Sequence, residues 1–172
     1  MEIPLTASIS LPPKQILFYR VNEVPYGVFS NFDAKHPIKL LDIIWPSTEH
    51  LFQAMKFSDA DYREQIRLAP TPRDAAKMGR DKNHPLRHDW EEVKYDIMWM
   101  AVHLKFNSYP ELRELLINTG NAEIIEHTSN DSTWADGGDG SGKNWLGKIL
   151  MDIREKFKKE MPVVIKNIPS QI

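Results

Sequence analysis

The chain has 172 residues, of which 41% are hydrophobic and 27% charged, which is typical of a globular protein with one core and not of a disordered chain. Its formal net charge of −2 excludes a field that would attract nucleic acid over the whole surface, although a local basic patch is compatible with it. The chain has no cysteine, which excludes disulfide bonds, thiolate metal sites and a cysteine nucleophile.

The chain divides into a central domain and two short ends. Residues 1–14 are polar, contain proline and lack the pattern of a signal peptide, so we expect a loose leader there. A single domain is predicted at 15–160, followed by a tail at 161–172. No apolar run approaches the ~20 residues that span a bilayer, and we expect a cytoplasmic, monomeric protein.

The first half of the chain mixes strands and helices. Short strands are predicted at 15–19 and at 38–45, the second being rich in β-branched residues. A Pro-Ser pair then opens a helix whose N-cap is Ser47. Two further helices are predicted at 60–68 and 72–78; the latter begins at a Thr-Pro pair and ends at a glycine.

The second half is helical apart from one loop. The longest helix is predicted to start after Asp89, with others at 110–118 and 145–159. Residues 122–127 fit either a strand or a helical turn, and residues 129–143, rich in glycine and aspartate, fit neither. The pattern predicts a helix-rich α+β fold, a single compact domain with a few short strands concentrated early.

The helix after Ser47 carries polar residues on one face. Glu49, Gln53 and Lys56 lie at i, i+4 and i+7, so they share that face, about 10 Å end to end along an ideal axis. A carboxylate there can act as a general acid or base, and a lysine can hold a phosphate or attack a carbonyl. The alternative is a solvated polar face, although Phe52 and other apolar neighbours argue against it.

The 129–147 region is a second candidate site. Long irregular segments inside a compact domain are often functional, and Gly140 to Asn144 lead into a helix N-terminus that suits a phosphate. Trp134 argues against a purely flexible loop, while Asp131, Asp136 and Asp139 are candidate acids. The alternatives are a flexible surface loop and simple helix capping.

Other features are weaker. A basic segment could contact phosphates or could be an ordinary charged surface, and Trp90 could stack on a ring or belong to the core. The turn with Tyr26, Phe29 and Asn31 suits base recognition or has no functional role. The histidines have no metal-site spacing, so no metal is expected. The basic side chains are Arg73, Lys77, Arg80, Lys82 and Arg87.

These residues lie in motifs that resemble one family. Residues 26–32 (YGVFSNF) match its G-x-F-S-N-F opening, and residues 45–57 (WPSTEHLFQAMKF) match its W-x-[ST]-x-E-H-x-[FY]-Q-x-x-K-F helix. AKMGR at 76–80, DWE at 89–91 and the segments NDSTWADG and GKNWLG, at 130–137 and 142–147, follow in order. Over roughly residues 16–157 the chain is similar to the YbiA-like, or NADAR (NAD and ADP-ribose associated), family.

The resemblance implies a helix-rich α+β fold and cofactor-free N-glycosidase chemistry. Some members cleave phosphorylated riboflavin-pathway intermediates, and others remove ADP-ribose from guanine bases of nucleic acid. The resemblance assigns Glu49, Trp90 and Asp136 to the catalytic set, with Lys56 as a Schiff-base candidate. Trp145 departs from the family pattern outside that set.

The expected function is therefore hydrolysis of a ribose–base bond, with ADP-ribosyl-guanine favoured because residues 73–87 supply more cations than one phosphate needs. The alternatives are the riboflavin intermediates and a non-catalytic NAD or ADP-ribose binder. Glu49 is expected to be the acid or base, Asp136 to position water or ribose hydroxyls, and Trp90 to stack on the base. The expected substrate-binding residues are Tyr26, Phe29, Asn31, Gln53, Arg80, Trp134, Gly137 and Asn144, with phosphate held by Arg80 and the 140–144 turn.

Overall fold

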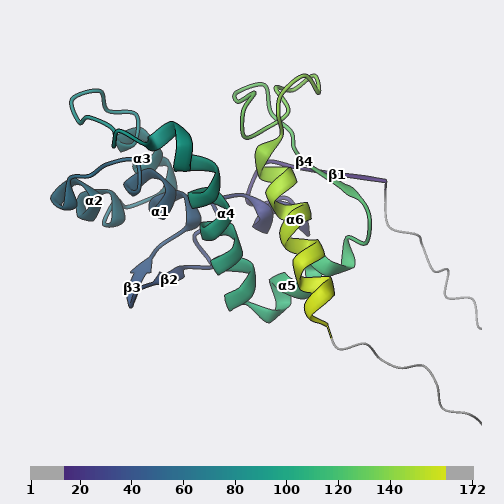
Figure 1. Cartoon of the computed structure of the whole chain (residues 1–172). Coiled ribbons are helices and arrows are strands. Elements are labelled where there is room, and N and C mark those ends of the chain that lie inside the picture. The colour runs from purple at the N-terminus through teal and green to yellow at the C-terminus, as the bar shows by residue number, and fades with distance from the viewer. Residues whose placement is uncertain (1–13, 162–172) are drawn as a thin grey trace, which may run out of the picture.

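The computed structural model describes residues 14–161 (Figure 1). Except for Lys14 and Met161, the expected leader and tail lie outside the described residues. The described elements in chain order are β1 Gln15–Phe18, the 3-10 helix η1 Tyr26–Phe29, β2 Ile38–Leu40, β3 Ile43–Trp45, α1 Thr48–Ala54, α2 Ala60–Arg67, α3 Pro72–Met78, α4 Trp90–Ser108, α5 Pro110–Asn118, β4 Glu123–Glu126 and α6 Trp145–Glu160.

The helix-rich α+β prediction is confirmed, and one predicted strand is wrong. Residues 38–45 form a hairpin in which β2 and β3 pair antiparallel, with Ile38 opposite Trp45. The two turn residues, Leu41 and Asp42, have φ angles of 48° and 64°. A two-residue hairpin needs this left-handed backbone, which glycine and asparagine usually supply, so the sequence lacked the usual turn signal.

The strand-or-turn ambiguity at 122–127 resolves as a strand. β4 pairs parallel with β1 near the other end of the chain, and Phe18 lies opposite Glu126. Helix α6 packs on β4 so closely that a Cβ added at Gly147 would lie 2.0 Å from the Ile124 carbonyl oxygen. Figure 1 shows β1 and β4 beside the first turns of α6, below the irregular loop.

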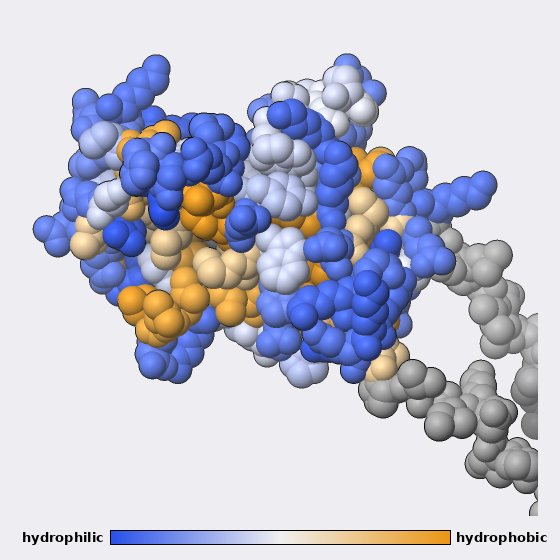
Figure 2. Space-filling model, in the orientation of Figure 1, coloured by the Kyte–Doolittle hydropathy of each residue, from blue (hydrophilic) through white to orange (hydrophobic). Residues whose placement is uncertain are grey.

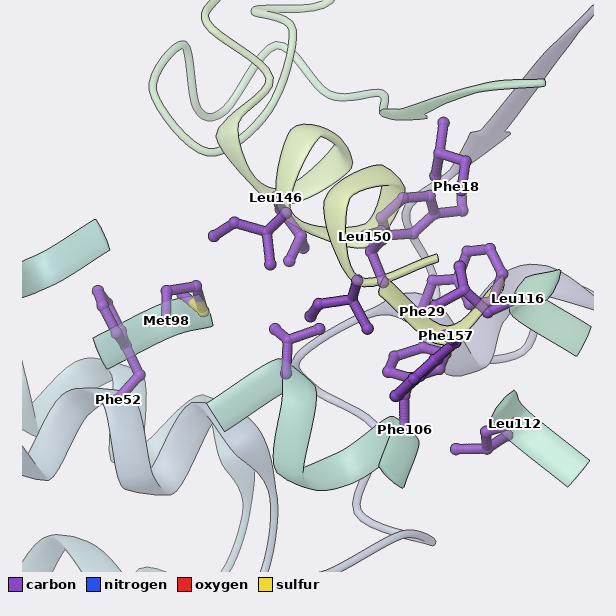
Figure 3. Packing of buried hydrophobic residues seen from close by; sticks show 14 of the residues in the cluster. Phe18, Phe29, Phe52, Met98, Phe106, Leu112, Leu116, Leu146, Leu150 and Phe157 are labelled. Carbon is purple, nitrogen blue, oxygen red and sulfur yellow. The ribbon is translucent and has the colours of Figure 1, made fainter. Parts of the chain in front are cut away.

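The hydrophobic core has two parts. The larger cluster joins α4, α5 and α6 to β1 and η1, and Figure 3 shows its aromatic centre around Phe106 and Phe157. Phe52 and Met98 lie at its far end in the same view. The second cluster surrounds α1, α2 and α3. Every residue of α1 is buried between the two, which contradicts the solvated-face alternative for this helix.

A buried ion pair fastens the 26–33 segment to α4. Lys105 is 1% exposed, and its ammonium lies 3.0 Å from the Asp33 carboxylate and donates to the Ser30 carbonyl oxygen at 3.2 Å. Burial lowers the pKa of Lys105 to about 8 against the opposing pull of Asp33. Because a buried charge must be paired, this contact fixes the turn that carries Asn31.

The surface is polar except near the hairpin. Leu41, Ile43 and Ile44 are exposed, and Figure 2 shows an apolar patch at the lower left, where the hairpin lies in Figure 1. In the part of the chain that is described, no helix combines the length and apolarity needed to cross a membrane.

The close packing of α6 on β4 gives a stability prediction. On an exposed helix, glycine to alanine stabilises by about 1 kcal/mol through helix propensity. Gly147→Ala is expected to do the opposite and destabilise by about 3 kcal/mol, because its methyl group would meet the Ile124 carbonyl oxygen. Urea unfolding measures this, with exposed Lys148→Ala as the control, expected within about 0.5 kcal/mol of the parent. A stabilised Gly147→Ala variant would contradict the packing argument.

Candidate active site

A cavity of about 340 Å³ opens between α1 and the segment that follows β4. In Figure 2 a notch at the top separates the α2–α3 side of the molecule from the loop before α6, and the cavity is lined from both sides of it. Its lining combines acids, two cations and aromatic rings. The lining residues are Tyr19, Asn31, Phe32, Glu49, Phe52, Gln53, Lys56, Arg80, Met98, Glu126, Thr128, Asn130, Asp131 and Trp134.

Half of the twelve candidate residues line this cavity. Those that do are Asn31, Glu49, Gln53, Lys56, Arg80 and Trp134. The others are Tyr26, Phe29, Trp90, Asp136, Gly137 and Asn144. Phe29 is 1% exposed in the core, with the Tyr26 ring packed against it at 5.3 Å, because the turn that carries them folds inward. The expectation that Phe29 contacts substrate does not fit this burial, whereas Tyr26 is half-buried and its expected contact with substrate stays a prediction.

Glu49 projects from the first turn of α1. Ser47 caps that helix by accepting from the His50 backbone N–H, so the helix starts where the sequence predicts. The Glu49 carboxylate accepts from Gln53 Nε2 at 2.6 Å. Burial raises the pKa of Glu49 above its ordinary value, although the Gln53 hydrogen bond and the charges of Lys56 and Arg80 act in the opposite direction. A carboxyl in this setting keeps its proton to higher pH than an exposed glutamate does, and it can act as a general acid or base.

Lys56 lies opposite the acids, but not on the helix itself. Helix α1 ends at Ala54 with Met55 as its C-cap, so Lys56 belongs to the following turn. Its ammonium donates to the Gly79 carbonyl oxygen at 3.3 Å and lies 5.9 Å from the centre of the Trp90 ring. Burial lowers the pKa of Lys56, with Glu49 opposing and Arg80 adding to the shift. A neutral amine is therefore accessible at lower pH than for an exposed lysine.

Trp90 supports the cavity from behind. It is 6% exposed and packs against Phe52 with ring centres 5.1 Å apart. Phe52 in turn meets Trp134 edge to face at 5.2 Å. Trp90 therefore holds the aromatic wall and the Lys56 side chain, and the expected direct stacking on a base does not fit its burial.

Glu126 is the functional candidate that sequence reasoning missed. It ends β4 and projects into the same cavity as Glu49. Burial raises its pKa to about 8, and the negative charges of Asp131, Glu49 and Asp136 add to the effect. A carboxylate at the end of a strand could have been singled out only if residues 122–127 had been recognised as a strand.

Asp136, Gly137 and Asn144 build the loop and do not line the cavity. Asp136 accepts from the His127 ring at 2.7 Å and from the Gly138 N–H at 2.8 Å. Burial pushes the pKa of Asp136 upward, but these hydrogen bonds outweigh it and the pKa is lowered. Gly137 has a φ of 75°, which the turn requires. The 140–144 turn opens onto a separate cavity of about 330 Å³, so the expected phosphate site there is not part of the first cavity.

The Asn144 side chain forms hydrogen bonds with the edge of β4 that does not pair with β1. Its side chain accepts from the Glu126 N–H at 3.1 Å and donates to the Ile124 carbonyl oxygen at 2.9 Å. It precedes α6 with a φ of 49° and makes no side-chain cap hydrogen bond, so the capping alternative is wrong. Within residues 14–161, no group of three His, Asp or Glu side chains is placed to hold a metal ion.

The Glu126 carboxyl predicts a pH-dependent stability. In the unfolded chain Glu126 loses its proton near its ordinary pKa of 4.5, whereas in the folded protein it keeps the proton to about pH 8. The contribution of this carboxyl to the free energy of unfolding is therefore lost as the pH rises between these two values. Glu126→Gln removes that loss. The free energy of unfolding of the variant, relative to the parent, is expected to rise by up to about 1.4 kcal/mol per pH unit over this range.

Urea unfolding of both proteins at several pH values in that range measures the difference. Glu123→Gln, a change at an exposed position of the same strand, is the control and should follow the parent. Parallel pH profiles for the parent and Glu126→Gln would contradict the assignment.

Comparison with known proteins gives the same family throughout. The family model of the NADAR domain matches residues 17–158 of this chain. The N-glycosidase YbiA of Escherichia coli (strain K12) is 50% identical over 145 residues, covering 84% of this chain and 89% of that protein. The riboflavin biosynthesis protein VVA0006 of Vibrio vulnificus is 37% identical over 149 residues, covering 86% of this chain but 40% of that protein. The NMR structure of E. coli YbiA superposes with a TM-score of 0.80 at 48% identity, covering 88% of this chain and 89% of that one. The chain belongs to the NADAR domain family.

Proposed function

We propose that this chain is an N-glycosidase that hydrolyses a ribose–base bond, and that its substrate is a guanine base of nucleic acid carrying ADP-ribose. The enzyme class follows from family membership and from the name of a relative that is half identical over almost its whole length. The observation that carries the chemistry is the buried Glu49 carboxyl facing Lys56 and Arg80 in an aromatic-walled cavity.

The reaction separates charge, and the cavity suits both ends of the bond. Breaking the bond builds positive charge on the ribose and negative charge on the leaving base. The Glu49 carboxylate stabilises the first and can activate water, while Lys56 and Arg80 can neutralise phosphate. Lys56 can also attack the open-chain C1 aldehyde after the base leaves, forming a Schiff base that water releases.

Aromatic groups at the mouth support the larger substrate. Phe32 is 41% exposed and Tyr19 is 38% exposed, yet both line the cavity together with the Trp134 ring. Exposed rings around a cavity stack readily on nucleobases, and a substrate with two bases would use more than one of them. ADP-ribosyl-guanine carries an adenine as well as the guanine.

The cation count no longer separates the two substrate classes. Of the basic segment at 73–87, Arg80 alone lines the cavity, while Arg87 pairs with Asp89 at 2.5 Å and Lys77 borders a different hollow. Arg80 and Lys56 match a diphosphate or one phosphate dianion equally well. The phosphorylated riboflavin-pathway intermediates therefore remain the second candidate, supported by the single arginine in the cavity and by the name of the Vibrio relative.

A side-by-side assay decides between the substrate classes. We expect release of ADP-ribose from an ADP-ribosylated guanine oligonucleotide to exceed release of base from the phosphorylated riboflavin intermediates, at equal enzyme and substrate concentrations. The reverse order would assign the second candidate. Binding of ADP-ribose without any release would indicate a non-catalytic binder.

Replacing Glu49 with glutamine, its amide analogue, tests its role. Glu49→Gln keeps an oxygen that can accept from Gln53 but cannot exchange protons, so base release should fall at least about 100-fold while substrate binding persists. Turnover and equilibrium binding measure the two effects. Glu64→Gln, an exposed carboxyl on α2, makes the same charge change outside the cavity and should leave turnover unchanged. Normal turnover by Glu49→Gln would refute the assignment.

The Schiff-base route predicts a covalent adduct on Lys56. Borohydride added during turnover should reduce the adduct and attach the ribosyl group irreversibly, and peptide mass spectrometry should locate it at Lys56. Lys56→Arg keeps the positive charge but cannot form the adduct, so it is the matched control. Hydrolysis without any trapped adduct in the parent protein would leave Lys56 with phosphate binding alone.

A further inference from the structure

The proposed hydrolysis requires two proton transfers. The leaving base must gain a proton as the C1′–N bond breaks, and the attacking water must lose one as it bonds to C1′. When two carboxyl groups flank a glycosidic bond, one can give the first proton while the other takes the second. Neither the family resemblance nor the similar proteins assign a second carboxyl group that would act together with Glu49.

Glu126 is held in the cavity by its backbone. Its N–H donates to the Asn144 side chain at 3.1 Å, and its carbonyl oxygen accepts from the Asp136 N–H at 3.0 Å. The strand therefore ends with both main-chain groups fixed, and the side chain reaches the same cavity as Glu49. No hydrogen-bond donor among residues 14–161 is assigned to the Glu126 carboxyl, so it is free to meet a substrate.

We propose that Glu126 is the general acid that protonates the leaving base, with Glu49 as the general base that activates water. This assignment rests on the proposed N-glycosidase function. The C1′–N bond breaks with its electron pair moving to the base nitrogen, which takes the proton of the Glu126 carboxyl. A water oxygen bonds to C1′ and gives its proton to the Glu49 carboxylate. Proton exchange with solvent then restores both groups, and the products are free base and ribose hemiacetal.

The neighbours of the two glutamates assign the roles in this direction. Burial raises the pKa of both carboxyl groups. At Glu49 the hydrogen bond from Gln53 and the charges of Lys56 and Arg80, which line the same cavity, oppose that rise and favour the carboxylate. At Glu126 the negative charges of Asp131, Glu49 and Asp136 add to the effect of burial, which favours the protonated form. Asp131 is committed to the backbone N–H groups of Thr133 and Trp134. Glu126 is thus the carboxyl of the cavity best suited to hold a proton.

The assignment also gives a physical meaning to Asp136 and Asn144. Neither lines the cavity, but Asn144 fixes the Glu126 N–H, and Asp136 fixes the N–H of Thr128, which does line it. They are positioning residues for the proton donor and its neighbour.

The test varies how much the leaving base needs a proton. One probe is an oligonucleotide with ADP-ribosylated guanine, and the other carries the same group on N7-methylguanine, whose positive charge eases departure without a proton. Glu126→Gln should lower kcat at least about 100-fold on the first probe and less than about 10-fold on the second. Glu49→Gln should lower kcat on both. Glu126→Asp, which keeps an acid, should retain more activity on the first probe than Glu126→Gln.

Equal losses on the two probes, or no loss, in folded Glu126→Gln would overturn the proton-donor role. Exposed Glu123→Gln on the same strand is the matched control and should behave as the parent. No release by the parent from either probe would overturn the proposed ADP-ribosyl-guanine substrate, and with it the role of Glu126 on that substrate.

Discussion

The complete burial of one short helix governs this structure. Helix α1 has seven residues, all of them buried, and it packs against α2, α3, α4 and β3. Its polar side chains must therefore find partners inside the protein. His50 bonds Ser47 at 2.8 Å and the Ala69 carbonyl oxygen at 3.1 Å, while Thr48 bonds the Asn31 side chain at 3.0 Å. The remaining polar pair, Glu49 and Gln53, faces the cavity, so the site lies where the interior leaves a polar helix face uncovered.

On the opposite side of the cavity, the backbone polar groups of β4 also need hydrogen-bond partners. Among the described residues, strand β4 pairs with β1 alone, and the Asn144 side chain bonds backbone groups on the other edge of β4. Gly147 lets α6 approach that edge closely enough for this bridge to form. The cavity therefore lies between a buried helix and a strand end held by a helix N-terminus. Both walls continue into the hydrophobic core through Phe52 and Met98.

Local signals in the sequence predicted the helices well, because their boundaries depend on short-range chemistry. Ser47 and the Thr71–Pro72 pair cap α1 and α3 as expected. The hairpin was missed because Leu41 and Asp42 adopt a left-handed backbone without the glycine or asparagine that usually marks such a turn.

The site was only partly predictable. Helical spacing brought Glu49 and Gln53 together, but burial of their face depends on distant helices that no local pattern reveals. The basic side chains at 73–87 have the same charge but point in different directions, so among them Arg80 alone lines the cavity. Glu126 went unnoticed because its position depends on pairing with a strand about a hundred residues earlier in the chain.

That pairing has a consequence for how the protein folds. β1 and β4 lie about a hundred residues apart in the chain, and parallel strands of high sequence separation pair late because the entropy of closing the intervening loop opposes them. The helices can form and collapse first, yet Glu126 meets Glu49 only when the two strands join. During refolding, helical signal should return before catalytic competence, so the reaction itself would report the final step of assembly.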